Sequence, residues 1–223
     1  EHEFVTIVGP SGCGKTTFLR MLLGVEKATK GELLIDGVPI APEPGPDRGI
    51  VFQRYSLFPH LTVRQNLLLG LEFERSRVLG RLFGNSRRLA EEKAATLLNA
   101  IGLYAARDKY PSQLSGGMQQ RLSIAQSVIR EPKILLLDEP FAGVDAKTEA
   151  SLVGLLRELQ KQGVTTLIAA HDLGTIGSYC DHIILLKGTV VASGRTKKVF
   201  TPQNIAKTYD SIFGKKGGIS WTS

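Results

Sequence analysis

A glycine-rich loop near the start of the chain has the residue types and the spacing of a phosphate-binding site. Residues 9–16 read GPSGCGKT and match G-x-x-x-x-G-K-[ST] at every fixed position, with an apolar run before them and a helix-like segment after them. Glycines let consecutive amides turn toward phosphate oxygens, and the start of a helix favours negative charge. We assign to this site Gly9, Pro10, Ser11, Gly12, Cys13, Gly14, Lys15, Thr16 and Thr17.

Two side chains of the loop have roles of their own, and an acidic strand end complements them. Lys15 is expected to reach the terminal phosphates of a nucleotide, and the Thr16 hydroxyl is expected to ligate Mg²⁺. The apolar run at 134–137 ends in Asp138 and Glu139, and ligands of open parallel sheets bind at the carboxyl ends of strands. We therefore expect Asp138 to hold Mg²⁺ through water together with Thr16. Glu139 is assigned as the general base toward a water in line with the γ-phosphate.

The elements that must position these residues alternate between strands and helices. Apolar or alternating runs predict strands at 4–8, 31–36, 49–52, 133–138, 164–170 and 182–186. Helical spacing predicts helices at 15–24, 62–71, 89–101, 117–130, 147–162 and 173–179. Such alternation predicts an α/β fold with a mainly parallel sheet flanked by helices. The helical excursion over about 61–130 predicts an inserted helical subdomain.

A second loop offers another anion-binding site. Residues 114–121 read LSGGMQQR just before a helix, so they supply a serine hydroxyl and glycine-exposed amides at a helix N-terminus. Two separated phosphate-binding loops in one chain are easiest to explain if each loop serves the nucleotide of a different copy.

Together these motifs resemble those of the nucleotide-binding subunits of ABC transporters, in which the segment at 114–121 is the signature motif. The resemblance extends from Phe4 to about Phe200. It implies that Gln53 is the Q-loop glutamine. This residue would be a further metal ligand and would sense both Mg²⁺ and the attacking water. It also implies that Asp145 belongs to the D-loop, and that His171 is the switch histidine that contacts the γ-phosphate.

The same resemblance implies the reaction, the assembly and the domain. The cofactors would be ATP and Mg²⁺, and a second copy or a homologous ATPase subunit would close head to tail around two nucleotides. Ser115, Gly116 and Gly117 of one copy would hold the ATP bound by the other. The fold would be that of a P-loop NTPase, forming one ABC ATPase domain over 1–223. We expect its RecA-like core at about 1–60 and 131–200, its helical subdomain at about 61–130, and a short C-terminal tail at 201–223.

Composition excludes several classes of protein. The 223 residues are 42% hydrophobic and 22% charged, as in a globular protein rather than a disordered or fibrous one. Apolar runs such as Ile183–Leu186 are far shorter than the about 20 residues of a spanning helix, so we do not expect the chain to cross a membrane by itself. Import would need separate transmembrane permease subunits and an extracytoplasmic substrate-binding protein. The chain would then lie peripherally on the cytoplasmic face of the inner membrane.

The transported substrate stays open. Residues 46–53 and 58–63 resemble those of nitrate, sulfonate and taurine importers, whereas residues 141–146 and 201–209 resemble those of manganese and zinc importers. Large apolar side chains at 55–58 suit either a docking surface for a membrane subunit or local core packing. Five arginines at 75–88, with no acid among them, suit either a solvated insertion or a patch near anionic lipid.

Two functions other than transport would suit parts of this sequence. The net charge of +7 would suit an ABC ATPase that acts on nucleic acid or ribosomes, but such proteins usually carry a long coiled-coil insertion or two fused halves, so no nucleic-acid partner is expected. A non-catalytic nucleotide binder is disfavoured because Glu139, His171 and Gln53 are all present. The chain starts in a strand-like run without Met, so we expect that it is trimmed at its front. Otherwise it would hold adenine less well, without the aromatic residue that stacks on the base in the family.

Overall fold

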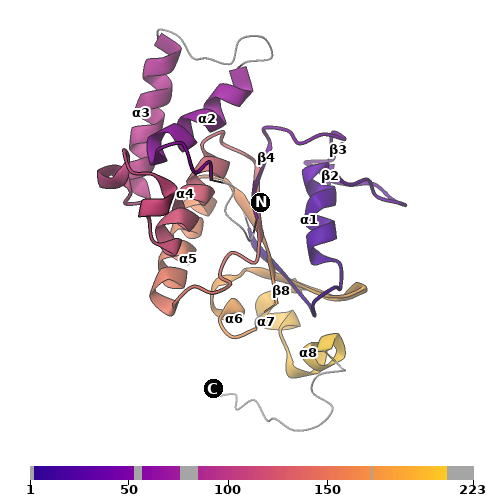
Figure 1. The fold of residues 1–223 in the computed structure, drawn as a ribbon. Helices are drawn as coiled ribbons and strands as arrows, with labels where there is room; N and C mark the ends of the chain where they lie inside the picture. Colours follow the sequence, from indigo (N-terminus) through magenta and orange to yellow (C-terminus); the bar gives the residue numbers. More distant parts are fainter. Residues whose placement is uncertain (1–2, 53–56, 76–84, 172, 210–223) are drawn as a thin grey trace.

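The computed structural model describes residues 3–52, 57–75, 85–171 and 173–209, and a six-stranded sheet runs through its centre (Figure 1). The strand order is β4-β5-β6-β1-β7-β8. Every neighbouring pair is parallel except β7 and β8, which are antiparallel. The strands are β1 (Phe4–Val8), β4 (Arg48–Val51), β5 (Ile134–Asp138), β6 (Thr165–Ala170), β7 (His182–Lys187) and β8 (Thr189–Arg195). The prediction of an α/β fold with a mainly parallel sheet is confirmed.

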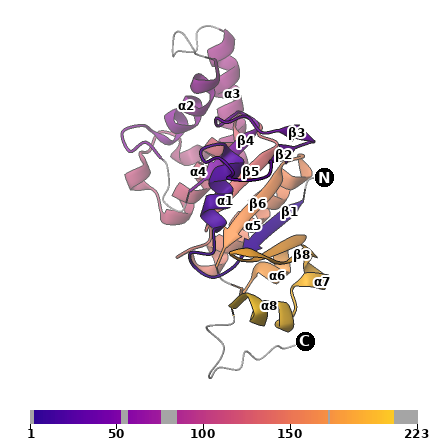
Figure 2. The same ribbon diagram turned by 90° about the vertical axis from the view of Figure 1, so that its right-hand side faces the viewer.

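Helices cover both faces of the sheet, as parallel sheets require (Figures 1 and 2). They are α1 (Lys15–Leu23), α2 (Val63–Arg75), α3 (Asn85–Ala100), α4 (Gly116–Val128), α5 (Ala146–Lys161), α6 (Ile176–Tyr179), α7 (Thr196–Val199) and α8 (Pro202–Tyr209). On one face, Ile7 and Leu136 pack against Leu19 of α1. On the other, strand residues one position away pack against α4 and α5, because successive side chains of a strand point to opposite faces. Within the described residues, we find no helix with the length and apolar character that a membrane span needs.

A second apolar cluster lies beside the sheet and is built from α2, α3 and α4. Its buried members include Leu67, Leu98 and Leu122. Leu97 and Leu155 pack against both this cluster and the core on the α5 face of the sheet, so the two cores are continuous there. The cluster draws its residues from positions 63–129, which supports our proposal of a helical subdomain over about 61–130.

Several segments differ from the sequence-based expectation, among them α6, which covers only part of the predicted helix at 173–179, and α7, which was not predicted. Within the predicted strand at 31–36, only β2 (Leu34–Ile35) forms, and it pairs with β3 (Val38–Pro39). Asp36 and Gly37 both have positive φ, which closes a tight two-residue hairpin. Strand β8 was not predicted, and its side chains are exposed or half-buried, so they lack the apolar pattern of a core strand.

Residues 202–209, where the sequence predicted no helix or strand, form α8 within the proposed C-terminal tail at 201–223. An eight-residue helix is marginal in isolation. Ile205 and Tyr209 are buried in the core on the α5 face, and Lys187 Nζ donates a hydrogen bond to Lys207 O, 3.3 Å away. Packing on the sheet therefore stabilises a helix that its own sequence does not.

A polar network joins the start of β1 to α5 and β7. The Asp181 carboxylate accepts hydrogen bonds from Phe4 N (2.9 Å), Gln160 Nε2 (2.8 Å) and Arg157 Nη1 (3.1 Å). The Arg157 guanidinium also donates to Tyr179 O and lies 5.2 Å from the centre of the Phe4 ring. Burial alone would raise the pKa of Asp181, but these hydrogen bonds outweigh it and hold the pKa below its ordinary value of 3.8.

Replacing this carboxylate tests the network. We expect Asp181→Ala to lower the free energy of unfolding at neutral pH by about 2 kcal/mol, because the Phe4 amide and the Arg157 guanidinium lose a shared acceptor. Since the folded-state pKa is lowered, the contribution of Asp181 is present above pH 3.8 and is lost as the pH falls through the folded-state value. Urea denaturation from neutral pH to below 3.8 measures the difference.

Asp108→Ala is the matched control, because Asp108 forms an exposed ion pair with Arg107. This variant is expected to change stability little at any pH. An Asp181→Ala defect that does not shrink in acid would contradict the assigned role of the charged carboxylate.

Candidate functional site

The register of the parallel strands brings three separate segments of the chain to one edge of the sheet. Val8 of β1 is paired with Ala170 of β6, and Asp138 of β5 is paired with Ala169. The residues that follow these strands therefore leave the sheet side by side. They are the phosphate loop from Gly9, the acid Glu139 and the histidine His171.

The phosphate loop turns sharply between β1 and α1. A Cβ atom on Gly9 would lie 2.0 Å from Leu186 O, so this position admits no side chain. Gly12 and Gly14 have φ of +77° and +104°, a region that glycine adopts without steric cost. Lys15 is buried, and its Nζ donates to Gly9 O (2.7 Å) and Pro10 O (3.1 Å), so the ammonium is held inside the loop. The free amides at the start of α1 and this cation form an anion site.

A hydroxyl from α1 meets a carboxylate from β5. Thr16 Oγ1 lies 3.1 Å and 3.3 Å from the two carboxylate oxygens of Asp138. Burial raises the pKa of Asp138 above its ordinary value, and the neighbouring Glu139 adds to the rise, although the Thr16 hydrogen bond and Lys15 oppose it. Hydroxyl and carboxylate oxygens are the ligands that Mg²⁺ prefers, and a desolvated carboxylate gains from a nearby cation. The residues present therefore fit a Mg²⁺ ion.

The second acid and the histidine form a pair. Glu139 Oε1 lies 3.1 Å from His171 Nδ1, and the Glu139 amide donates to Ala169 O at 2.8 Å. Glu139 has φ of +50°, an uncommon conformation for a residue with a side chain. Backbone of this kind persists where the surrounding structure fixes it, and it is concentrated at functional sites. Tyr209 Oη donates to His171 O at 3.3 Å, so α8 contributes to holding the histidine.

Glu139 and His171 open onto a cavity of about 350 Å³. Its walls are the segment 140–144 and the turn before α6, and Phe141 and Tyr179 lie against each other in it with ring centres 5.5 Å apart. Glu149 and Thr175 line the same cavity. The cavity is thus continuous with the edge of the sheet where the strand ends meet.

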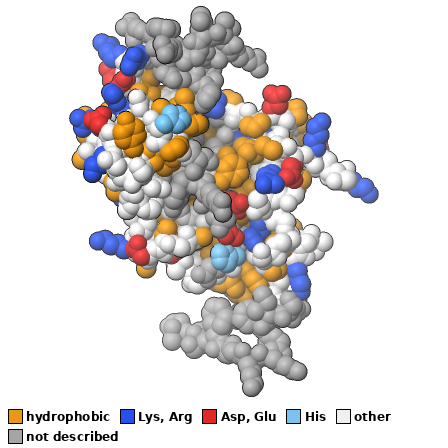
Figure 3. Space-filling model, viewed as in Figure 1, with side chains coloured by type: hydrophobic (Ala, Val, Ile, Leu, Met, Phe, Trp, Pro, Cys, Tyr) orange, Lys and Arg blue, Asp and Glu red, His pale blue; other side chains and the backbone are white. Residues whose placement is uncertain are grey.

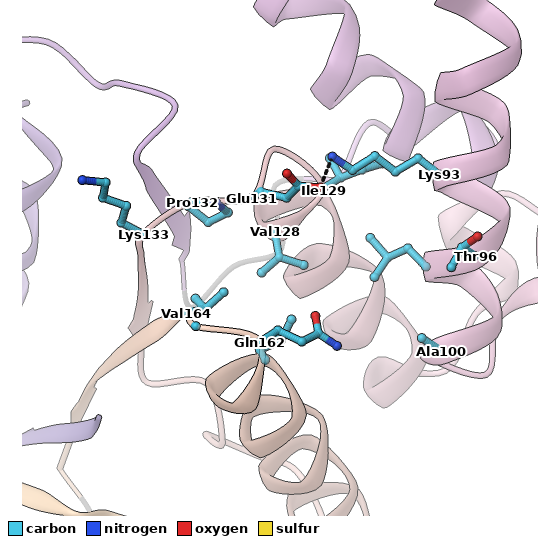
Figure 4. A pocket seen from close by; sticks show the side chains of 13 residues that line it. Lys93, Thr96, Ala100, Val128, Ile129, Glu131, Pro132, Lys133, Gln162 and Val164 are labelled. Atoms are coloured by element: carbon cyan, nitrogen blue, oxygen red, sulfur yellow. Dashed lines mark ion pairs between the residues drawn. The ribbon is translucent and has the colours of Figure 1, made fainter. Parts of the chain in front are cut away.

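A cavity of about 490 Å³ lies elsewhere, between α3, the turn after α4 and the turn after α5 (Figure 4). Val128, Ile129 and Val164 line it, and Lys93 and Glu131 form an ion pair beside it with Nζ and Oε1 2.7 Å apart. None of the assigned site residues that the structure describes lines this cavity. Cavity volume alone therefore does not identify the candidate site.

The remaining assigned residues form a second group at the starts of α4 and α5. Ser115 caps α4, and its Oγ accepts a hydrogen bond from Met118 N at 3.4 Å. Asp145 caps α5 by accepting from Thr148 N (3.0 Å) and Thr148 Oγ1 (2.7 Å), and the hydrogen bond from the Thr148 hydroxyl lowers the pKa of Asp145. A Cβ on Gly117, which follows Gly116 in the first turn of α4, would lie 2.7 Å from Thr148 Cγ2.

The phosphate loop and the starts of α4 and α5 adjoin helices on opposite faces of the sheet. Helix α1, with the phosphate loop before it, covers one face, whereas α4 and α5 cover the other (Figure 1). Ser115 caps α4, Gly116 and Gly117 begin it, and Asp145 caps α5, so these residues adjoin the helices of the face opposite α1. Gln53 lies outside the described residues, as do residues 76–84 of the arginine-rich stretch.

The large apolar side chains at 55–58, which suit either a docking surface or core packing, differ in how far they are exposed to solvent. Leu57 packs against the cluster of α2, α3 and α4, whereas Phe52 and Phe58 are each 38% exposed, and Tyr55 lies outside the described residues. Figure 3 shows apolar side chains gathered on this face of the molecule. The buried Asn66 amide accepts from Phe58 N (2.8 Å) and donates to Phe58 O (3.2 Å), so the exposed Phe58 has a fixed backbone.

Residues that the sequence did not indicate also belong to the site. Thr148, Glu149, Thr175 and Tyr209 each contact an assigned residue or line its cavity. The spacing of a helix cap, with Thr148 three residues after Asp145, could have indicated Thr148. No motif marks Glu149, Thr175 or Tyr209, because their contacts join segments that are far apart in the sequence.

Comparisons with known proteins agree with this geometry. A family model described as ABC transporter matches residues 1–142. The chain is 40% identical over 200 residues to an uncharacterized ABC transporter ATP-binding protein of Methanocaldococcus jannaschii, covering 89% of this chain and 70% of the relative. It is 39% identical to a spermidine/putrescine import ATP-binding protein of Pseudomonas aeruginosa, covering 92% and 54%. It is also 39% identical to a nitrate import ATP-binding protein of Synechococcus elongatus, covering 90% and 30%. The chain thus spans about half of these import relatives or less.

Solved structures share the fold. An ATP-binding cassette of an ABC transporter in its ADP conformation superposes with a TM-score of 0.82 at 26% identity, covering 96% of this chain and 89% of that one. A protein of Clostridium perfringens that is part of an ABC transporter complex gives a TM-score of 0.78 at 30% identity, covering 95% and 84%.

The steric requirement at Gly9 yields a prediction about the loop. We expect Gly9→Ala to destabilise the fold by about 3 kcal/mol and to remove nucleotide binding, because the new methyl group meets Leu186 O and displaces the phosphate loop. Gly154→Ala on α5 is the matched control, since nothing lies within 4 Å of its Cβ, and it is expected to stabilise by up to about 1 kcal/mol. Thermal unfolding with and without nucleotide measures both effects. Retained nucleotide binding by Gly9→Ala would show that the loop does not need this close approach.

Proposed function

The chain belongs to the ABC transporter family of ATP-binding proteins, and from this premise we propose that it binds and hydrolyses Mg·ATP to power solute import through separate membrane subunits. One observation carries the proposal. The phosphate loop, the Thr16–Asp138 pair and the Glu139–His171 pair converge on one edge of the sheet. Each supplies a different part of phosphoryl transfer, namely phosphate binding, metal binding and activation of water.

The amides at the start of α1 and the Lys15 ammonium bind the phosphates. Lys15 Nζ exchanges its bonds to Gly9 O and Pro10 O for the terminal phosphate oxygens. Thr16 and Asp138, with Gln53, hold Mg²⁺, which neutralises negative charge on the phosphates when it is bound. Thr17 and the backbone from Ser11 onward hold the remaining phosphate oxygens.

Glu139 accepts the proton of the attacking water, and His171 orients the carboxylate. The Nδ1–Oε1 distance of 3.1 Å allows a hydrogen bond that selects one orientation of Glu139. His171 also contacts the γ-phosphate in this proposal. Most of the catalysis is then positioning and charge stabilisation, as in other phosphoryl transfers.

Two copies of the chain, or the chain and a homologous subunit, complete each site. The phosphate loop precedes α1 on one face of the sheet, whereas Ser115 and Asp145 cap α4 and α5 on the other (Figure 1). Two copies closed head to tail let these residues of one copy contact the ATP bound by the other. The helix caps at Ser115 and Asp145 hold both loops ready for this contact.

The remaining partners follow from the importer relatives. Transmembrane permease subunits carry the solute, an extracytoplasmic binding protein delivers it, and the chain lies peripherally on the cytoplasmic face of the inner membrane. The substrate is chosen by those other subunits. Relatives are named for the import of spermidine/putrescine, Fe³⁺ ions or nitrate, so the similarity does not single out one type of substrate.

Removing the proposed base tests the chemistry. We expect Glu139→Gln to lower ATP turnover by at least about 100-fold while nucleotide binding is retained, because the amide cannot accept the proton of water. Phosphate release and ATP binding measure the two effects. Glu158→Gln, an exposed exchange on α5, is the control and is expected to leave both unchanged. Substantial turnover by Glu139→Gln would remove this residue from the base role.

A second measurement tests the transporter. A tag on this chain is used to purify its partners from detergent-solubilised membranes, and mass spectrometry identifies them. We expect a polytopic membrane protein, and we expect Phe58→Ala to reduce its recovery about tenfold, because Phe58 offers an exposed aromatic anchor. Tyr104→Ala, at another exposed aromatic residue, serves as the control. Recovery of nucleic acid or ribosomes alone would contradict transport while leaving the ATPase chemistry in place.

A further inference from the structure

We propose that Thr175 and Glu149 are positioning residues that fasten the segment 171–175 to α5 and thereby hold His171 beside Glu139. This inference rests on the proposed function, because it concerns the same site. Thr175 Oγ1 donates a hydrogen bond to Glu149 Oε1. Thr175 lies at the end of the segment that joins β6 to α6, and Glu149 lies in the first turn of α5.

Both ends of the segment 171–175 are held by other contacts. At its start, His171 contacts Glu139 through Nδ1 and accepts the Tyr209 hydroxyl through its carbonyl oxygen. After its end, Ile176 and Tyr179 of α6 are buried. Between these anchors, Leu173 packs against the core on the α5 face, whereas Thr175 is exposed to solvent and apolar packing does not hold it. Its hydrogen bond to Glu149 connects the segment to the neighbouring helix α5.

The first turn of α5 is itself held in place by a helix cap and by close packing against α4. Asp145 caps it through Thr148, the neighbour of Glu149. Gly117 of α4 packs so closely on Thr148 that a Cβ would come within 2.7 Å of Thr148 Cγ2. The hydrogen bond therefore ties the segment that carries His171 to the place where the starts of α4 and α5 meet.

The geometry places this fastening next to the proposed chemistry. Glu149, Thr175, Glu139 and His171 all line the cavity of about 350 Å³. A hydroxyl bonded to a carboxylate is a charge-assisted pair, but an exposed pair is weakened by competing water. We therefore expect that its loss lowers kcat roughly threefold to tenfold, without a matching change in the KM for ATP.

The test compares two substitutions at one position. Thr175→Val keeps the shape of the side chain and removes the hydroxyl, whereas Thr175→Ser keeps the hydroxyl. We expect faster amide hydrogen exchange over residues 171–179 and a lower kcat in Thr175→Val, and behaviour near that of the wild type in Thr175→Ser. Thr96→Val on α3 is the control for the exchange itself, since Thr96 donates to Glu92 O in its own helix turn and to no other acceptor in the described part of the chain.

The same substitution made in the His171→Ala protein distinguishes a positioning role from general destabilisation. If Thr175 acts through His171, adding Thr175→Val to His171→Ala causes no further loss of single-turnover rate. Unchanged exchange in Thr175→Val, failure of Thr175→Ser to restore kcat, or an equal loss in the His171→Ala background would each overturn the proposal. Absence of turnover in the wild-type chain would instead contradict the proposed function, and the exchange measurement would still decide whether the hydrogen bond holds the segment.

Discussion

The parallel register of β1, β6 and β5 is the constraint on which the rest of the structure depends. It pairs Val8 with Ala170 and Asp138 with Ala169, and so brings the phosphate loop, Glu139 and His171 to one edge of the sheet. A slip of one residue would exchange the two faces of a strand. Leu135 and Leu136 are both fully buried, on opposite faces, so the packing of both layers fixes the register and with it the site.

Charged and polar groups are buried at the same edge of the sheet, and a bound ligand can offset the free energy that their burial costs. Within the described residues, the buried Lys15 ammonium donates to neutral carbonyl oxygens of the loop, and burial raises the pKa of Asp138. Glu139 has a left-handed backbone. A phosphate suits the cation and a metal ion suits the desolvated carboxylate, so these features favour a ligand that brings both charges. The parallel sheet positions these groups, and the Asp181 network fixes the opposite end of β1 through the Phe4 amide.

The sheet also separates two half-sites. The phosphate loop starts α1 on one face, while Ser115 and Asp145 start α4 and α5 on the other (Figure 1). The contact between Gly117 and Thr148 sets how α4 meets α5, and Glu149 continues that contact toward Thr175. In the proposed pair of copies closed head to tail, each half-site of one copy faces the unlike half-site of the other, so the two contacts are equivalent and the interface is isologous.

Local patterns by themselves determined most of the elements and the phosphate loop. The glycine spacing at 9–16 and the apolar run at 134–137 specify a loop and a strand, and the structure places α1, β5 and α5 within two residues of the predicted bounds. Strand β8 and helix α8 were missed because one lacks a clear apolar pattern and the other is too short to form alone. Only the tertiary structure decided the contacts of Thr175 with Glu149 and of Tyr209 with His171, which join residues 26 and 38 positions apart. No spacing in a chain encodes such pairs, because they arise from how the helices pack on the sheet.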